Sequence, residues 1–320
     1  MTDPNPDAVS SNRPVLAVVT AFNPSVALVT LCEGLLEQTD GVVVVDDGST
    51  GGPAVDTILS ECEALGCVVV RTGHNRGIAA ALNRGVTAAR SMTPEPGSIV
   101  TFDQDSIVAS GYIDALVDAA DDAVAAGVPV GMVAPERVEG VPQTRRGELR
   151  GVALGAEPIQ SGLLLPESAL SRLGPFLESL FIDCVDTEYY MRARSNGLET
   201  VVARETSLGH ALGTKTAVSV LGRAVVVKGR PVSITLSAPF RYYYLARNRC
   251  TMNRLFGRAH PAWAAKETLL DLRHFLIALA LGPSRVLRAR VILAGLGDGV
   301  RGRGGRIPAG VEALARRIRR

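Results

Sequence analysis

Two aspartates one residue apart, Asp103 and Asp105, follow the apolar residues Ile99 and Val100. This order predicts a buried strand that runs out into a loop. Both carboxylates can reach one hard divalent cation if the backbone turns there, because Mg²⁺ and Mn²⁺ favour one or two carboxylates completed by phosphate oxygens and water. Such a site suits a substrate that carries a diphosphate. A solvated loop is the alternative, since this spacing of two aspartates often arises by chance.

Three further acids, Asp183, Asp186 and Glu188, lie among apolar residues before a predicted helix. Carboxylates in a dry setting must be bonded or titrating, and one of them is a natural general base for deprotonating a hydroxyl. The competing interpretation is that these acids lie in the first turn of the helix, where the helix dipole favours negative charge. His210, one of four histidines, could complete a metal site with Asp103 and Asp105, or serve structurally.

Polar residues also end the predicted strands nearer the N-terminus. Asp46 and Asp47 can accept from a ribose or a base N–H, although Asp-Asp-Gly-Ser equally suits a turn or helix cap. Asn75 and Gly77 belong to a segment that could present donors to a diphosphate or form an ordinary turn. Asn83, in the helix that follows, faces the site or merely packs.

Buried apolar runs alternate with helical patterns through the first half of the chain, which predicts an α/β fold with a mostly parallel sheet. Ligands bind at the carboxyl ends of the strands in such sheets, where the polar residues above cluster. We expect strands at Val15–Thr20, Val42–Val45, Cys67–Val70, Ser98–Phe102 and Val130–Pro135, and helices at Ser25–Glu37, Val55–Leu65, Ile78–Arg90 and Tyr112–Ala126. Residues 137–151 are charged and rich in glycine, and are expected to form a loop.

The charge is unevenly distributed along the 320 residues. Residues 1–240 carry a net charge of −11 and residues 241–320 one of +13, which suggests two regions with different tasks. We expect a flexible N-terminus over 1–13, a main domain over 14–240 and a basic helical region over 241–320. The apolar fraction of 47% indicates a globular chain, with no apolar run long enough to span a membrane and no apparent signal peptide. The five cysteines show no zinc-ligand spacing, so we expect reduced thiols and a cytoplasmic location.

Seven short motifs occur in order between residues 14 and 250: Thr-Ala-Phe-Asn-Pro, Val-Asp-Asp-Gly-Ser, Asn-Arg-Gly-Ile-Ala, Phe-Asp-Gln-Asp-Ser, Phe-Ile-Asp-Cys-Val-Asp-Thr-Glu, His-Ala-Leu-Gly and Arg-Tyr-Tyr-Tyr-Leu-Ala-Arg-Asn. Together they resemble the family 2 glycosyltransferases, and the fourth and fifth most resemble the bacterial rhamnosyltransferase branch. Asp47 stands where many rhamnosyltransferases have Asn. Cys184 and Val185 stand where relatives often carry Tyr or Trp.

The resemblance implies a GT-A fold, a nucleotide-sugar donor, an inverting displacement and Mn²⁺ or Mg²⁺ as cofactor. It implies Asp103, Asp105 and His210 as metal ligands, Asp186 as the catalytic base, and Asp183 and Glu188 in the acceptor site. Arg241 and Tyr243 would help to close the site over the diphosphate or the acceptor. The residues implied to bind or border the donor are Thr20, Phe22, Asn23, Asp46, Asp47, Asn75, Gly77, Asn83, Asp103, Gln104, Arg247 and Asn248.

The expected reaction is transfer of L-rhamnose from dTDP-L-rhamnose to a cell-surface polysaccharide or a glycan on a polyprenyl lipid. UDP-galactofuranose, UDP-GlcNAc and UDP-glucose are alternative donors, and a nucleotidyltransferase or a noncatalytic binding protein are more remote readings. The basic region could lie on the cytoplasmic face of the inner membrane, form an oligomer contact or stay solvated. Nucleic-acid binding is not expected, because no motif for it accompanies the charge.

Overall fold

The computed structural model describes residues 13–93, 96–210, 215–217, 219–220, 223–224, 226–227, 230–231 and 233–318; the side chains of residue 210 and of the residues described within 215–235 are outside the description. The chain divides into two compact units. Unit 1 comprises residues 1–178 and 185–211, and unit 2 comprises residues 179–184 and 212–320. The expected boundary at residue 240 therefore differs from the division seen here, which also assigns the short segment 179–184 to unit 2.

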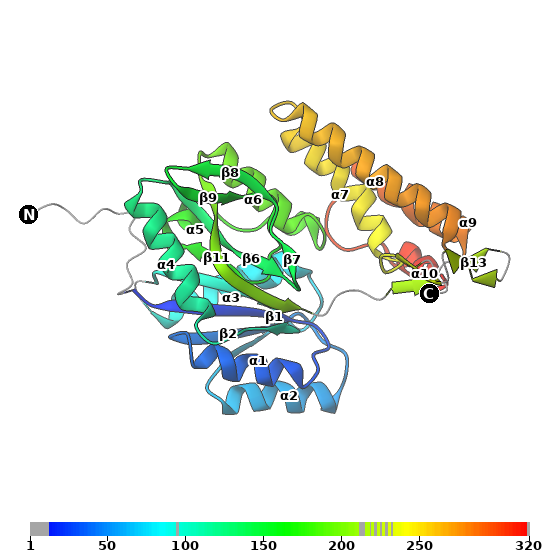
Figure 1. Ribbon diagram of the computed structural model, residues 1–320. Helices are drawn as coiled ribbons and strands as arrows, with labels where there is room; N and C mark the ends of the chain where they lie inside the picture. The colour runs from blue at the N-terminus through cyan, green and yellow to red at the C-terminus, as the bar shows by residue number, and fades with distance from the viewer. Residues whose placement is uncertain are drawn as a thin grey trace, which may run out of the picture. The chain divides into compact units, whose positions relative to one another are not determined.

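Four parallel strands form one half of the main sheet of unit 1, in the order β3-β2-β1-β4 (Figure 1). Their apolar side chains are buried on both faces in β1, β2 and β4, as expected for a parallel sheet covered by helices. Thr20 lies opposite Asp103, and Ala21 opposite Asp46, so the strands end at the same edge. The strands are β1 (Val15–Ala21), β2 (Gly41–Asp46), β3 (Val68–Arg71) and β4 (Ser98–Asp103).

The other half of the sheet is mixed. After β4 the order continues β10-β6-β11-β9-β8, with β10 antiparallel to both neighbours and β6 parallel to β11. Short strand β5 pairs with the end of β11, and β7 pairs with β6. The bounds are β5 (Ser106–Ile107), β6 (Val130–Val138), β7 (Val141–Pro142), β8 (Arg145–Leu149), β9 (Val152–Gly155), β10 (Leu163–Pro166) and β11 (Glu199–His210).

Helices cover both faces of this sheet. Apolar residues of α1, α2 and α4 form one core with alternate residues of the strands, including Ala17, Val19 and Val44. Helix α3 lies on the opposite face, where Gly85 approaches Val18 so closely that an added Cβ would lie 2.2 Å from its Cγ1. The bounds are α1 (Ala27–Leu36), α2 (Pro53–Ala64), α3 (Ile78–Met92), α4 (Tyr112–Ala125), α5 (Glu167–Leu173), the 3₁₀ turn η1 (Glu178–Leu180) and α6 (Val185–Ser195).

The loop expected over residues 137–151 is wrong, since most of it forms two hairpins. Glu139 and Gly140 join β6 to β7 with φ values of 50° and 74°, and Arg150 and Gly151 join β8 to β9 with 52° and 81°. Positive φ at both residues of a two-residue connection is the type I′ geometry that matches the twist of hairpin strands. The charged side chains of β8 are exposed at the sheet edge, which explains why its sequence lacks an apolar pattern.

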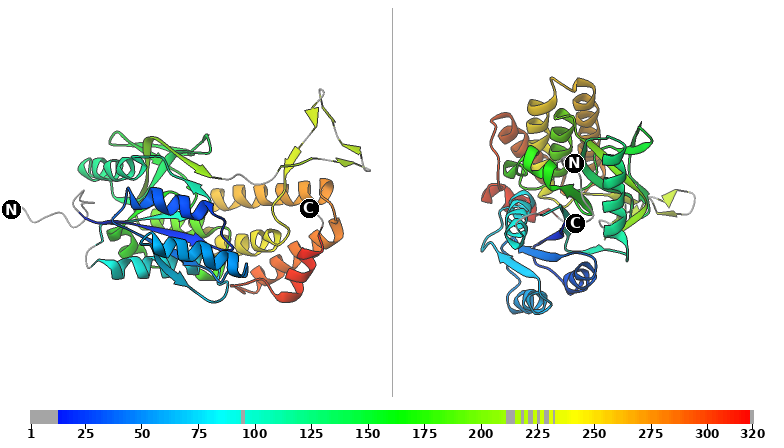
Figure 2. Two further views of the ribbon diagram at one scale, coloured as in Figure 1. Left: turned by 90° about the horizontal axis from the view of Figure 1, so that it is seen from below. Right: turned by 90° about the vertical axis from the view of Figure 1, so that its left-hand side faces the viewer.

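Unit 2 contains four helices among its described residues and three short antiparallel pairs, β12–β17, β13–β14 and β15–β16. Its core is built around Tyr242, Tyr243 and Tyr244 of α7, which pack with apolar residues of α8, α9 and α10. Figure 2 shows these four helices in yellow to red. No helix in the described part of the chain is long and apolar enough to cross a membrane. The bounds are β12 (Lys215–Ala217), β13 (Ser219–Val220), β14 (Arg223–Ala224), β15 (Val226–Val227), β16 (Arg230–Pro231), β17 (Ser233–Thr235), α7 (Arg241–Phe256), α8 (Pro261–Leu281), α9 (Arg285–Val300) and α10 (Ala309–Arg316).

Candidate functional site

The loops after β1, β2 and β4 are tied together at the carboxyl edge of the sheet. The Gln104 side chain receives the Phe22 N–H at 2.8 Å and donates to the Phe22 carbonyl at 3.3 Å. Asn23 receives the Thr50 N–H through its side chain at 2.8 Å and donates its own N–H to Ser49 Oγ at 2.7 Å. The structure therefore brings together these segments, which are predicted to bind the donor. Thr20 lies at the end of β1, just before the first of them.

Asp46 and Asp47 are both buried, and both carboxylates bind nearby groups of the protein. Asp46 receives the N–H and hydroxyl of Ser49. Asp47 receives the N–H groups of Arg76 at 2.9 Å and Gly77 at 2.8 Å. Burial raises the pKa of the Asp47 carboxyl, and the two N–H groups oppose that shift. The carboxylate of Asp47 thereby shapes the 72–77 loop.

The other residues predicted to border the donor, Asn75, Gly77 and Asn83, differ in their surroundings. Asn75 Oδ1 is buried without a hydrogen-bond partner, which leaves an acceptor for a ligand. Gly77 has a φ of 92°, a value that favours glycine, at the start of α3. Asn83 instead binds the backbone of Phe176 in both directions, at 2.8 and 3.0 Å, and its role toward the donor stays a prediction.

Asp103 and Asp105 lie half-buried in the turn between β4 and β5. Ser161, a residue not singled out from the sequence, supports this turn through its hydroxyl, which receives the Asp103 N–H at 3.1 Å and lies 2.7 Å from Ser106 Oγ. The β5–β11 pairing sets the backbone of His210 opposite Ser106, next to Asp105. The predicted metal ligands thus come from segments that adjoin one another.

The chemistry of this set fits a hard divalent cation, because two carboxylates from one turn leave positions for diphosphate oxygens and water. No group of three His, Cys, Asp or Glu side chains with metal-binding geometry occurs among the side chains that the structure describes. The imidazole of His210 is outside that part. Asp103, Asp105 and His210 therefore remain the proposed ligands, with the two carboxylates as the described part of the set.

Asp186 and Glu188 both lie in the first turn of α6, but only Asp186 is partly open. Asp186 is half-buried and receives the Thr187 N–H at 2.7 Å. Glu188 is buried and forms a two-point ion pair with Arg192, with N–O distances of 3.0 and 2.7 Å. A carboxylate held in this way suits a structural role. Of the two carboxylates, that of Asp186 is the more exposed.

The segment that leads to α6 is unusual in its backbone and in its anchoring within unit 2. Phe181, Asp183 and Cys184 have φ values of 63°, 60° and 62° without being glycine, at a cost of about 1–2 kcal/mol each. The Asn248 amide donates to the carbonyls of Leu180 at 3.1 Å, Ile182 at 2.7 Å and Asp183 at 2.8 Å.

Arg247 adds to this anchoring. It donates to the carbonyls of Ser179 at 3.0 Å, Leu180 at 2.7 Å and Gly305. Its guanidinium also lies over the rings of Tyr243 and Tyr244. With relative exposures of 1% for Arg247 and 0% for Asn248, the two side chains predicted to bind the donor are occupied by the backbone.

Asp183 is ion-paired with Arg241, whose Nε lies 3.0 Å from the carboxylate. Both residues were expected near the acceptor or diphosphate, and the structure brings them together within unit 2. Nothing in the sequence signals the positive φ angles of Phe181, Asp183 and Cys184 or the anchoring of residues 179–183. The nearest signal was the Arg-Asn pair at the end of the seventh motif.

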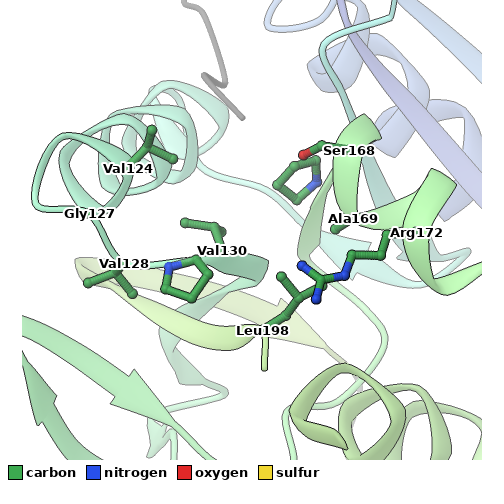
Figure 3. Close-up of a pocket in the computed structure, with 10 residues that line it drawn as sticks. Val124, Gly127, Val128, Val130, Ser168, Ala169, Arg172 and Leu198 are labelled. Carbon is green, nitrogen blue, oxygen red and sulfur yellow. The ribbon is translucent and has the colours of Figure 1, made fainter. Parts of the chain in front are cut away.

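A cavity of about 310 Å³ lies in unit 1 at the start of β6 and just before β11, at the edge of the sheet opposite to the loops above (Figure 3). The guanidinium of Arg172, which lines it, is occupied by the carbonyl of Asn196 at 2.6 Å. No predicted site residue lines the cavity. We therefore place the candidate site at the carboxyl edge, where the loops gather the predicted polar groups.

Comparison with known proteins bears on the family and the fold of the chain. Residues 16–159, which include β1 to β4 and the Asp103–Asp105 turn, match the family model of glycosyl transferase family 2. The chain is 27% identical over 304 residues to the dTDP-rhamnosyl transferase RfbF of Shigella flexneri, covering 91% of this chain and 97% of that protein. The mixed, mostly parallel sheet with helices on both faces is consistent with the GT-A fold. The protein is therefore a glycosyltransferase with a family 2 domain, and it is rhamnosyltransferase-like.

Proposed function

We propose that this protein is a metal-dependent, inverting rhamnosyltransferase, which moves L-rhamnose from dTDP-L-rhamnose to a hydroxyl of a polysaccharide or lipid-linked glycan. The observation that carries this proposal is the carboxylate turn Asp103–Asp105 at the strand edge, beside the loops tied by Gln104 and Asn23. The name of the similar Shigella flexneri protein supports the choice of donor.

The proposed roles follow from charge development during the reaction. A bound divalent cation would neutralise the negative charge that grows on the diphosphate leaving group. Asp103, Asp105 and His210 would hold it. Asp186 would accept the proton of the acceptor hydroxyl as that oxygen attacks the sugar on the face opposite the leaving group. One displacement of this kind inverts the anomeric centre, and it requires no covalent intermediate.

For the donor itself we propose contacts from the edge loops. Thr20, Phe22, Asn23 and Gln104 would line the nucleotide pocket, with the unpartnered Asn75 Oδ1 as an acceptor for a donor hydroxyl. Asp47 and Asn83 would act by holding loops, because their polar atoms already bind the backbone. Asp46, bonded to Ser49, would act in the same way.

We further propose that Arg247 and Asn248 are positioning residues rather than donor ligands. They bind the carbonyls of residues 179–183, and Asp183 precedes Asp186 by three residues. This anchoring holds the backbone of the segment that directly precedes α6 in the sequence. Strained backbone of this kind persists only where surrounding contacts determine it, and it is common at functional sites.

Asn248→Ala tests this positioning role. We expect a loss of about 2–4 kcal/mol in the free energy of unfolding, because the carbonyls of Ile182 and Asp183 lose the Asn248 donor and that of Leu180 keeps only its other donors. In the folded variant kcat should fall by about 10- to 100-fold with the donor KM unchanged, since the base rather than the donor is displaced. Denaturant unfolding and steady-state kinetics measure the two effects.

Asn253→Ala is the matched control, because Asn253 lies on the same helix and its amide binds the Thr268 hydroxyl. Its kinetics should match those of the unchanged protein. A folded Asn248→Ala variant whose donor KM rose while kcat stayed constant would instead favour direct donor contact.

A panel of nucleotide sugars tests the reaction as a whole. The purified protein is incubated with Mn²⁺ or Mg²⁺, a lipid extract as acceptor, and each of dTDP-L-rhamnose, UDP-galactofuranose, UDP-GlcNAc and UDP-glucose. We expect nucleoside diphosphate release from dTDP-L-rhamnose alone, abolished by EDTA. An α-to-β or β-to-α change at the anomeric carbon, read by NMR of the product, tests inversion.

Other outcomes of the panel have separate meanings. Release of nucleoside diphosphate from a different nucleotide sugar would leave the proposed site residues in place and overturn the choice of dTDP-L-rhamnose as donor. Release that persists in EDTA would overturn the proposed dependence on a divalent metal. Pyrophosphate release from a nucleoside triphosphate would indicate a nucleotidyltransferase. Donor binding without turnover, measured by calorimetry, would indicate that the lipid extract lacks the acceptor that the enzyme uses. We also propose a cytoplasmic location, in keeping with the reduced thiols expected from the sequence.

A further inference from the structure

Helix α8 of unit 2 has a row of exposed leucines. Leu269, Leu272 and Leu276 have relative exposures of 65%, 50% and 58%. Their spacing of three and four residues sets them on one side of the helix, whereas Ala264 and Ala278 are buried on the opposite side. Exposed apolar side chains that are scattered need no explanation, but a row on one helix face marks a contact surface.

Helix α9 has a second row of the same kind. Val286, Leu293 and Val300 are 74%, 64% and 70% exposed, and they recur every seven residues on one side of the helix. The opposite side packs against α7, where Gly295 approaches Tyr243 so closely that an added Cβ would lie 2.2 Å from its carbonyl oxygen. The two rows therefore lie on the exposed sides of helices whose other sides pack in the core of unit 2.

The charges on these helices are sorted by sign. Their three acids are bonded within unit 2. Asp271 receives the Arg249 Nε–H at 2.6 Å, and Asp298 receives the Tyr243 hydroxyl at 2.8 Å. Glu267 pairs with Lys266 at 3.0 Å and lies 3.8 Å from the Arg249 guanidinium. The exposed charges on α8 and α9 are cations, namely Lys266, Arg273, Arg285 and Arg290.

Cations border each apolar row. Arg273 follows Leu272 and lies four residues after Leu269, and Arg290 lies three residues before Leu293. At these spacings a long side chain lies beside the row and can extend its charged end away from it. Apolar side chains bordered by arginine and lysine are the pattern of helices that lie in the interface of a lipid bilayer.

We propose that the α8 and α9 faces bind the surface of an anionic lipid bilayer. The rows enter the region between headgroups and acyl chains, and the bordering cations bind lipid phosphates. A second copy of this chain is a poorer partner, since cations would meet cations. Nucleic acid would leave the leucines and valines without a role. This inference concerns docking and stands whether or not the donor is dTDP-L-rhamnose.

Co-sedimentation of the full chain with vesicles tests the docking. We expect binding to vesicles of equal parts phosphatidylglycerol and phosphatidylcholine, and little to phosphatidylcholine alone. Raising NaCl from about 0.1 M to about 0.5 M should weaken binding, because the shorter Debye length screens the cations. The combined variant Leu269→Gln, Leu272→Gln and Leu276→Gln should bind at least tenfold more weakly, because three apolar side chains no longer enter the lipid.

Two further variants sharpen the result. The set Val286→Gln, Leu293→Gln and Val300→Gln tests α9 in the same way. A control with Val26→Gln and Val141→Gln changes two exposed apolar residues of unit 1, at 69% and 60% exposure, and should bind vesicles as the unchanged protein does. Because all these side chains are exposed, circular dichroism should show intact folding.

The proposal is overturned if the unchanged protein ignores anionic vesicles at low salt, or if both helix variants bind as well as the control. It is also overturned if sedimentation velocity shows an oligomer that the helix variants dissociate while vesicle binding persists, because the rows then join copies of the chain. Binding to duplex DNA that the leucine variant retains, without vesicle binding, would assign the charge to nucleic acid.

Discussion

Asp186→Asn is expected to lower kcat for glycosyl transfer by about 10³-fold, within the range that general base catalysis contributes. The substitution keeps the size of the side chain, and the amide oxygen can still receive the Thr187 N–H that Asp186 receives at 2.7 Å. What is lost is the ability to take the proton of the acceptor hydroxyl. The affinity for the donor should stay unchanged, because no step of donor binding requires the base.

The measurement pairs steady-state turnover with donor calorimetry. Glu188→Gln is the control from the same helical turn. Glu188 is held by Arg192, so its replacement should reduce stability more than the chemical step. If Asp186→Asn turned over at the normal rate while Glu188→Gln was inactive but folded, the base would have to be reassigned to Glu188.

Continuous apolar runs predict β1 to β4, and a parallel strand buried on both faces, such as β1, β2 or β4, needs no polar alternation. The runs around Val18, Val44 and Val100 are fully buried, as that rule requires. The polar residues directly after these strands therefore had to meet at one edge. The sequence therefore predicts that the loops of Phe22, Asp47 and Asp103 lie together.

Other features depend on contacts between distant segments, which a local pattern does not encode. Strand β8 is exposed, so its charged sequence resembles that of a loop. Its pairing with β9 is what makes it a strand. The hydroxyl of Ser161 reaches Asp103 across 58 residues, and the Asn248 amide reaches Asp183 across 65. A motif alone does not distinguish a donor-binding role for Arg247 and Asn248 from a supporting one, whereas their burial and their bonds to backbone carbonyls favour support.

Asp105→Ala is expected to lower turnover of dTDP-L-rhamnose by about 10³-fold, since a metal that stabilises leaving-group charge contributes several kcal/mol to the transition state. The Asp105 carboxylate lies in the turn before Ser106, whose backbone faces that of His210. Removing it takes away one negative ligand, so Mn²⁺ should bind more weakly. Electron paramagnetic resonance of free Mn²⁺ reports that affinity independently of activity.

The control is Asp118→Asn, which removes an exposed carboxylate from α4 on the same unit and should leave both Mn²⁺ affinity and turnover unchanged. Higher Mn²⁺ concentration should partly restore Asp105→Ala if the defect is metal affinity, because the remaining ligands still come from Asp103 and the end of β11. Asp186→Asn should show no such recovery, which separates metal from base. Full turnover by Asp105→Ala in EDTA would remove the cation from the mechanism and leave the diphosphate to the N–H groups and side chains of the edge loops.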